Sequence, residues 1–270
     1  MSLKDTIEAI FAAGAGADRD EAREAFARLQ QQLSAGEVRS AEPDTTSPTG
    51  WRVNTWVKQG ILLGFRFGDN VDLSMGGWPF YDKDTMPLKR PGAGVRIVPG
   101  GSSVREGAFL GKGVICMPPM YINIGAYVGE GTLVDSHALV GSCAQIGKHV
   151  HLSAAAQIGG VLEPAHASPV VIEDGAFVGG LAGVFEGVVV RQRAVLAAGV
   201  VLTAATQVHD LVHGRILRGE IPASAVVVPG TRPAPGPHAE LHRLQVATAL
   251  IVKYRDDRTD AATALESALR

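Results

Sequence analysis

The sequence has little cysteine, few aromatic residues and almost no net charge. Its two cysteines, Cys116 and Cys143, form no CxxC pair and are too few for a disulfide scaffold. We interpret both as small core side chains in a reducing compartment, and Cys143 as unreactive. The formal net charge of −2 lacks the basic excess typical of nucleic-acid-binding proteins, so we expect no nucleic-acid partner.

Long hydrophobic runs are also missing. No apolar run approaches 18 residues, and the first residues show no basic segment followed by an apolar one. We therefore expect a cytoplasmic protein without a membrane partner. The composition, 46% hydrophobic and 19% charged over 270 residues, fits one large soluble domain or a core with appendages.

The strongest positive signal is a six-residue repeat. Every sixth residue is aliphatic in two stretches, 122–158 and 172–208. Because Ile, Leu and Val make up about a quarter of the chain, chance would give this run less than about once in a hundred million. The repeat positions are Ile122, Val128, Val134, Val140, Ile146, Leu152 and Ile158, then Ile172, Val178, Val184, Val190, Leu196, Leu202 and Val208.

A period of six does not keep one face of an α-helix apolar, but it suits short strands separated by turns. Hexapeptide periodicity is the signature of a β-helix, in which three hexads close one triangular coil and stacked coils bury a continuous core. Glycine often follows the aliphatic, as in Gly129, Gly141 and Gly179, which indicates a corner where a Cβ is costly. Weaker hexads extend the stack backwards through Val98, Val104, Leu110 and Cys116.

The flanking segments predict a small helical α/β domain at residues 1–94, the β-helix at 95–230 and a strand-helix extension at 231–270. The domain should contain a helix at 3–13, a second from Asp18 to Gly36, and a third capped by Asn54. Residues 61–67 would switch to a strand, and 68–94 would form a loop-rich surface connection.

Later segments interrupt or follow the repeat. Residues 163–169 should bulge out as a loop, because two hexads do not fill the gap before Ile172. We expect the phase to be lost over 209–220 and one last turn of the repeat at 221–228. A Pro-rich linker at 232–237, a strand at 244–254 and a helix from Thr259 to Arg270 should complete the chain.

Four motifs inside the repeat carry a resemblance to a known family. They are Asn-Ile-Gly-Ala-Tyr-Val at 123–128, Val-Asp-Ser-His at 134–137, Val-Gly-Ser-Cys-Ala-Gln-Ile-Gly at 140–147 and Ile-Gly-Gly-Val-Leu-Glu-Pro at 158–164. These strings and nearly the whole remaining chain resemble the tetrahydrodipicolinate N-succinyltransferases of lysine and diaminopimelate biosynthesis, a hexapeptide-repeat acyltransferase family.

The resemblance implies a left-handed β-helix in a homotrimer, with active sites between adjacent subunits. It also implies succinyl-CoA as co-substrate, no tightly bound cofactor, and a cyclic imine dicarboxylate as acceptor. In that family the positions of Arg96 and Asp135 contact the acceptor, and Asp135 is the favoured general base. The chemistry is sensible, because an attacking amine must lose a proton to a carboxylate and an Arg fork suits a substrate carboxylate.

One departure concerns a second acid. Many family members carry an acidic residue at the position of Gly183, and here Glu186 lies three residues further on. Glu186 either faces the cleft from a neighbouring turn of the repeat or is merely solvated. His137 is an alternative base, since acyltransferases of this fold class often use histidine. Asp135 itself stands where several hexads have glycine, so a turn-forming role is the competing interpretation.

For the other polar residues, a surface or structural role competes with a functional one. His149 and His151 alternate like strand residues, but no third ligand stands at a recognisable spacing, so we predict solvated surface and no metal site. Glu163 would hold the mid-repeat loop. Four arginines are either ligands for CoA phosphates or simply exposed: Arg191, Arg193, Arg215 and Arg218.

Three rival functions stay open. One keeps the fold but uses another acyl group, such as acetyl, or a related amine acceptor in a lysine-derived pathway, because fold does not fix substrate. A non-catalytic trimer that binds a metabolite is a further alternative, against which the retention of both Arg96 and Asp135 argues. A carbonic-anhydrase-like protein would require metal-binding histidines contributed across subunits.

Overall fold

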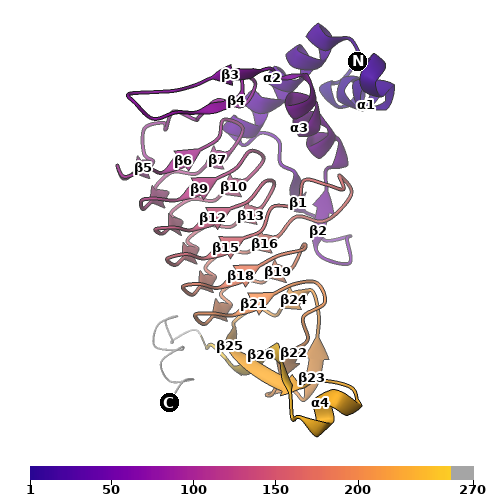
Figure 1. Cartoon of the computed structure of the whole chain (residues 1–270), viewed down its shortest axis with the longest axis vertical. Coiled ribbons are helices and arrows are strands. Elements are labelled where there is room, and N and C mark those ends of the chain that lie inside the picture. Colours follow the sequence, from indigo (N-terminus) through magenta and orange to yellow (C-terminus); the bar gives the residue numbers. More distant parts are fainter. Residues whose placement is uncertain (257–270) are drawn as a thin grey trace.

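A computed structural model describes residues 1–256. These residues form an N-terminal helical domain, a three-sided parallel β-helix and a C-terminal β extension, one after another along the long axis of the molecule (Figure 1). Within them, no helix combines the length and apolarity needed to cross a bilayer. The mainly β architecture and the helical N-terminal domain follow the prediction, and the parallel pairing of every third strand produces the triangular coil.

The β-helix has three faces, each a sheet of two-residue parallel strands. Face I consists of β7 (Phe109–Leu110), β10 (Tyr127–Val128), β13 (Gln145–Ile146), β16 (Val171–Ile172), β19 (Val189–Val190) and β24 (Glu220–Ile221). Face II consists of β5 (Arg96–Ile97), β8 (Ile115–Cys116), β11 (Leu133–Val134), β14 (His151–Leu152), β17 (Phe177–Val178) and β20 (Val195–Leu196). Face III consists of β6 (Ser103–Val104), β9 (Tyr121–Ile122), β12 (Leu139–Val140), β15 (Gln157–Ile158), β18 (Gly183–Val184) and β21 (Val201–Leu202).

The repeated aliphatics point into one continuous core. Thirteen of the fourteen lie in these strands and are 0–1% exposed. The fourteenth, Val208, is 2% exposed. The backward extension is confirmed at Val104, Leu110 and Cys116, which are all buried. The prediction for Val98 is wrong, because Ile97 pairs with Cys116 and takes the inward position. An extra residue in the turn at Gly100 and Gly101, both with positive φ, shifts the phase by one.

Glycines directly after the aliphatic are required by close packing of successive coils. A Cβ on Gly179 would lie 2.6 Å from the backbone nitrogen of Ala198, which belongs to the next coil. The left-handed backbone conformation falls two residues later, at Gly131, His137 and Cys143, with φ of 68°, 63° and 68°. The corners with glycine after the aliphatic therefore combine a close approach of two coils with a left-handed turn two residues later.

The N-terminal domain packs α1 (Leu3–Ala13), α2 (Arg19–Ala35) and α3 (Thr55–Phe67) around a second core. The first two helices begin at Ser2 and Asp18 as predicted, with both side chains accepting a backbone N–H. The predicted switch to a strand at 61–67 is wrong, because α3 continues to Phe67. Gly64 lets this helix approach α2 closely, since a Cβ there would lie 2.5 Å from Phe26 Cε2.

The cap predicted for α3 is also wrong, because the Asn54 side chain does not bond to the helix. Its amide donates instead to the carbonyl of Arg39, 2.9 Å away, and so ties the start of α3 to the chain ahead of β1 (Ala41–Pro43). This strand pairs with β2 (Trp51–Val53) in a hairpin that lies against face I.

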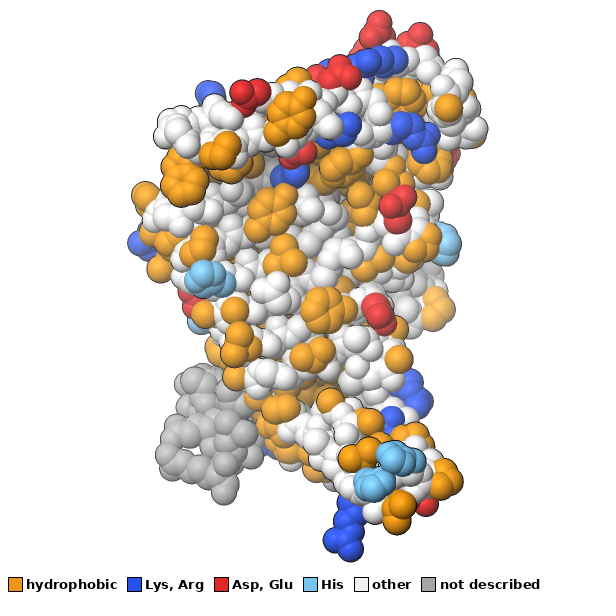
Figure 2. All heavy atoms as spheres, viewed as in Figure 1, with side chains coloured by type: hydrophobic (Ala, Val, Ile, Leu, Met, Phe, Trp, Pro, Cys, Tyr) orange, Lys and Arg blue, Asp and Glu red, His pale blue; other side chains and the backbone are white. Residues whose placement is uncertain are grey.

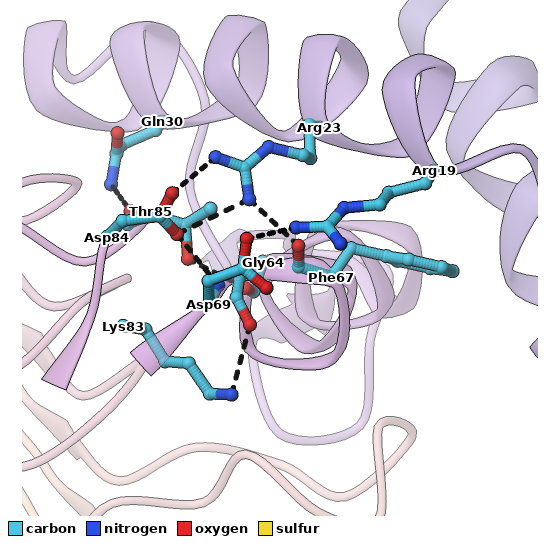
Figure 3. Close-up of polar contacts among 10 residues, drawn as sticks. Arg19, Arg23, Gln30, Gly64, Phe67, Asp69, Lys83, Asp84 and Thr85 are labelled. Carbon is cyan, nitrogen blue, oxygen red and sulfur yellow. Dashed lines mark hydrogen bonds and ion pairs between the residues drawn. The ribbon is translucent and has the colours of Figure 1, made fainter. Parts of the chain in front are cut away.

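The connection at 68–94 contains a hairpin, β3 (Asn70–Asp72) with β4 (Tyr81–Lys83), which the turn-rich sequence did not indicate. Figure 3 shows how α2 holds the base of this hairpin. Arg23 donates to the Phe67 carbonyl at 2.9 Å and pairs with Asp84 at 2.5 Å, and Arg19 pairs with Asp69. The Arg23 hydrogen bond lowers the pKa of the Asp84 carboxyl. Met86 beyond the hairpin is buried, so the connection is not wholly surface.

The C-terminal end of the stack is an antiparallel extension of face II. The phase is lost after Val208 as predicted, but the segment forms the hairpin β22 (Val208–Asp210) and β23 (Arg215–Leu217). Strand β25 (Ala225–Pro233) runs through the predicted boundary at 230, so the Pro-rich linker is confined to 234–236 before α4 (Pro237–Leu241). The strand predicted at 244–254 is confirmed as β26 (Gln245–Tyr254). The helix predicted from Thr259 lies outside the described residues.

Asp210 is the polar centre of this extension. Its carboxylate is 1% exposed and receives hydrogen bonds from Tyr254 Oη at 2.7 Å, Arg215 Nε at 3.0 Å and His213 Nδ1 at 2.8 Å. Burial alone would raise the pKa of Asp210, but the hydrogen bonds from Tyr254, His213 and Arg215 outweigh it and lower the pKa well below its usual range. This carboxylate joins β22, the turn after it and β26.

We expect Asp210→Asn to lower the melting temperature at pH 7 by about 5 °C, because hydrogen bonds to a charged group contribute about 1.5 to 3 kcal/mol. Because the pKa of Asp210 is lower in the folded protein, the stability that its carboxylate contributes is present above the unfolded pKa of about 3.9. This stability is lost as the pH falls below that value. The difference between parent and variant should therefore shrink below about pH 4. Calorimetric scans across pH test this, with Glu240→Gln on exposed α4 as the matched control, and a pH-independent difference would contradict the account.

Candidate active site

Arg96 and Asp135 lie on the same side of the β-helix. Arg96 is the outward residue of β5 on face II, and Asp135 directly follows β11 on the same face. Only β8 separates the two strands, so their backbones are about 10 Å apart across the sheet. Arg96 is exposed and Asp135 half-buried.

Asp135 begins the turn that joins face II to face III. Its Oδ1 accepts a hydrogen bond from the backbone N–H of Ser136 at 2.7 Å. Among the described residues its side chain makes no ion pair, so Oδ2 is open to a ligand. The carboxylate is thus held in place without being neutralised, which is the condition that a general base needs.

His151 is a titratable neighbour of Asp135 that the sequence reasoning set aside. It is the outward residue of β14, one strand beyond β11 on face II, and its ring packs at a tilt against Phe177, with 4.9 Å between the centroids. Burial lowers the pKa of His151, and the charge of Asp135 opposes that shift. The prediction of solvated surface holds for His149, which is exposed at another corner, but not for half-buried His151. The signal was its place in the hexad, the same outward place that Arg96 occupies.

His137 shares the turn of Asp135. Its backbone lies in the left-handed region, its N–H donates to the carbonyl of Pro119, and its side chain is exposed. Its carbonyl accepts from Gln157 Nε2 at 3.1 Å, which fixes the turn against the next strand of face III. His137 is therefore close to Asp135 along the chain and turned to solvent in the single chain.

Glu186 lies at a different corner, between face III and face I. Glu186 is separated from Asp135 by the width of face III and by two strand spacings along the axis, from β12 to β18. The distance between them is therefore at least about 10 Å. Glu186 lines an open groove of about 680 Å³ together with Glu163 and Phe185, between this corner and the loop at 159–170. One chain therefore does not bring Glu186 to Asp135.

The loop that forms this groove follows the prediction at 163–169, and a buried lysine secures it. Lys58 of α3 is fully buried and its Nζ donates to the carbonyl of Ala167. Burial lowers the pKa of Lys58. Because Lys58 belongs to the N-terminal domain, that domain sets the position of the loop, and Glu163 is carried on the loop's exposed side.

Phe185 accounts for the missing side chain at Gly183. A Cβ on Gly183 would lie 2.5 Å from Phe185 Cε2, and one on Gly159 would lie 2.7 Å from Phe185 Cδ1. The aromatic ring thus covers both glycines on face III. An acidic side chain at position 183 would clash with the Phe185 ring in this placement, so the residue types at positions 183 and 185 depend on one another.

Three of the four arginines are held by contacts within the fold. Arg191 pairs with Glu173 and Glu220, each at 2.9 Å, and Arg215 pairs with Asp210. Arg193 donates to the carbonyl of Asp256, and Arg218 is exposed. Cys143 is fully buried in the second core, and burial raises the pKa of its thiol to about 11. Residues 1–256 contain no group of three metal-ligating side chains.

Two family models match the chain. The first, described as tetrahydrodipicolinate N-succinyltransferase N-terminal, matches residues 2–67, which are the helical domain. The second, described as hexapeptide repeat of succinyl-transferase, matches residues 169–204 in the β-helix. Among solved structures, a putative 2,3,4,5-tetrahydropyridine-2-carboxylate N-succinyltransferase from Campylobacter jejuni has a TM-score of 0.53 at 16% identity, covering 92% of this chain and 64% of that one.

Curated relatives extend the similarity over the whole length. A 2,3,4,5-tetrahydropyridine-2,6-dicarboxylate N-succinyltransferase from Rhodopseudomonas palustris is 44% identical over 289 aligned positions, covering 100% of this chain and 98% of that protein. One of the same name from Polynucleobacter asymbioticus is 44% identical over 255 positions, covering 92% and 90%. The alignment with the Rhodopseudomonas palustris protein includes the helical domain, the hexapeptide core and the C-terminal extension. The chain therefore belongs to the 2,3,4,5-tetrahydropyridine-2,6-dicarboxylate N-succinyltransferase family.

Proposed function

We propose that this protein transfers a succinyl group from succinyl-CoA to the nitrogen of tetrahydrodipicolinate, a step of lysine and diaminopimelate biosynthesis. The observation that carries the proposal is the full-length similarity to relatives of that name, at 44% identity. The common placement of Arg96 and Asp135 on face II supports it, since the acceptor has carboxylates for the arginine and a nitrogen that must be deprotonated.

In the proposed reaction water first adds across the C=N bond of the cyclic imine, so that the acceptor nitrogen carries a proton, and this nitrogen then attacks the thioester carbonyl carbon. A C–N bond forms, the C–S bond breaks, and CoA leaves as a thiolate that takes up a proton. Asp135 accepts the proton that the nitrogen loses, through the oxygen that Ser136 does not engage. Arg96 binds an acceptor carboxylate through its planar fork and so orients the nitrogen. Neither step requires a tightly bound cofactor.

The proposed active unit is a homotrimer of left-handed β-helices. Asp135 and His137 stand at one edge of face III, whereas Glu163 and Glu186 stand at the other. In a heterologous interface, the Asp135 edge of one copy lies against the Glu186 edge of the next copy. A threefold rotation then closes the ring of copies. The coil surfaces in Figure 2 carry few charged side chains compared with the N-terminal helices, which suits burial between copies.

A second candidate keeps the fold and changes the acyl group or the acceptor. Phe185 favours it, because its ring fills the space over Gly183 where the family resemblance implies an acid. An apolar groove floor suits a short acyl chain such as acetyl. Turnover measured with succinyl-CoA and with acetyl-CoA separates the candidates. We expect a clear preference for succinyl-CoA, and the reverse preference would favour the second candidate.

We predict that Asp135→Asn lowers turnover by roughly 10² to 10⁴ while the fold stays intact, because the amide keeps the size of the side chain but accepts no proton. Steady-state rates and circular dichroism measure the two quantities. Glu130→Gln, at an exposed corner of the same β-helix, is the matched control. Activity within a few-fold of the parent would move the base to His137 or His151.

Replacing Arg96 with Lys keeps the charge and removes the fork. We expect KM for the acceptor to rise roughly ten- to hundred-fold, from a loss of about 1.5 to 3 kcal/mol, with little change for acyl-CoA. Saturation curves for both substrates measure this, with Arg90→Lys as the control just before β5. A change confined to acyl-CoA would contradict the assignment of Arg96 to the dicarboxylate.

The trimer predicts a molar mass in solution of about three times the 28.2 kDa of the chain. Light scattering after size exclusion measures the mass, and activity is followed over the same dilution series. Since each proposed site needs two copies, activity per chain should fall wherever the trimer dissociates. A monomer that keeps full activity would overturn the shared site.

A further inference from the structure

We propose that the pocket between the β1–β2 hairpin and face I binds a small oxyanion, a carboxylate or a phosphate, through Arg39 and Lys148. The pocket has a volume of about 270 Å³ and lies beside strands of face I, whereas Arg96 and Asp135 are on face II. Its lining includes Arg39 and Trp51 from the N-terminal domain and Tyr127, Lys148 and Asp174 from the β-helix. This site is independent of the acyl-transfer proposal.

Arg39 presents its guanidinium in a fixed plane. Its Cζ lies 3.7 Å above the centroid of the Tyr127 ring and 5.5 Å from that of Trp51. Nε donates to Gln145 Oε1 at 2.9 Å. Gln145 is fully buried and donates in turn to Ser40 Oγ at 2.8 Å and to the Cys143 carbonyl at 2.9 Å, so its oxygen cannot turn away from the arginine.

Within residues 1–256, the terminal nitrogens of Arg39 have no hydrogen-bond acceptor, and no carboxylate lies within ion-pairing distance of them. Burial lowers the pKa of Arg39, which reflects the cost of a half-buried cation lacking a counter-ion. Cation–π contact offsets part of that cost. An oxyanion bound to the free fork would offset more, through two charge-assisted hydrogen bonds.

The pocket lining carries two basic side chains, Arg39 and Lys148, and two acidic ones, Glu173 and Asp174. Both oxygens of Glu173 are engaged, Oε1 by Trp51 Nε1 and Arg191 and Oε2 by the backbone N–H of Gln192. Asp174 Oδ1 accepts from the backbone N–H of Lys148 at 2.7 Å, and its charge opposes an anion. The Lys148 ammonium makes no ion pair within the described chain. Arg39 and Lys148 therefore face one carboxylate, Asp174, that has no cationic partner within residues 1–256.

A neighbouring cavity that Arg39 also lines is a poorer anion site. Its lining carries three carboxylates, of which Glu8 and Glu42 pair with Lys4 and Arg52, so the other two cations of this cavity are already engaged. The pocket at Trp51 and Tyr127 has aromatic walls in addition, which exclude water from a bound carboxylate or phosphate. Its size admits a metabolite of a few heavy atoms or the end of a larger one.

Isothermal titration with inorganic phosphate and with acetate, at matched ionic strength in chloride, tests the proposal. We expect saturable binding with Kd in the range of about 0.1 to 10 mM, which lies below the affinity ceiling for ligands of four or five heavy atoms. Arg39→Gln should weaken binding at least about ten-fold, since it removes the fork and its charge. Arg52→Gln, in the same hairpin but paired with Glu42, is the matched control and should bind like the parent.

Arg39→Lys keeps the charge and gives a second readout if the glutamine variant does not fold. It should lose affinity for acetate more than for phosphate, because a carboxylate depends on the bidentate fork. Asp135→Asn should bind both anions like the parent, which separates this site from the acyl-transfer site. No saturable binding up to about 20 mM, or equal binding by Arg39→Gln and the parent, would overturn the proposal.

Discussion

The close stacking of successive coils is the constraint on which the remaining structure depends. Face I, face II and face III each keep their strands in register because the aliphatic of every hexad sits above that of the coil before it, as Val128 does above Leu110. The corners must then be narrow, and a Cβ at Gly129 or Gly179 would collide with the next coil. Asp135 follows the aliphatic of its hexad as these glycines do, so the candidate base stands at a corner of the β-helix, at the end of β11.

Periodicity made the core predictable, and the corners between strands were less so. Inward positions from Val104 to Val208 could be read from the sequence, since each is specified by one local pattern. Val98 failed because one extra residue near Gly100 moves the phase, which no pattern of aliphatics reveals. Residues 61–67 failed because a short apolar run fits a strand or a helix equally, and only packing of Gly64 on Phe26 decides it.

For the candidate site, the sequence indicated which residues to consider but not which of them meet. Arg96 and Asp135 share a face because β5, β8 and β11 stack on one another, a relation that the phase shift near Gly100 hides from the hexad count. His151 lies after that shift, one 18-residue coil from Leu133, and could have been found by counting hexads. The distance between Glu186 and Asp135 depends on how many corners lie between them, and the effect of Phe185 on Gly183 depends on a ring orientation that sequence does not specify. Lys58 belongs to a distant helix, so its hold on the loop at Ala167 had no sequence signal.

Both ends of the stack are covered by elements that are not part of the repeat. At the start, Ser34 of α2 accepts the backbone N–H of Gly107 at 2.8 Å and bonds to Glu106, so a helix lies over the first coils. At the other end, β26 and β22 continue face II with antiparallel and longer strands. A parallel stack of identical short strands offers open edges on which further chains can add. These two coverings confine growth to the side of the molecule, so the protein can assemble around an axis without extending into a filament.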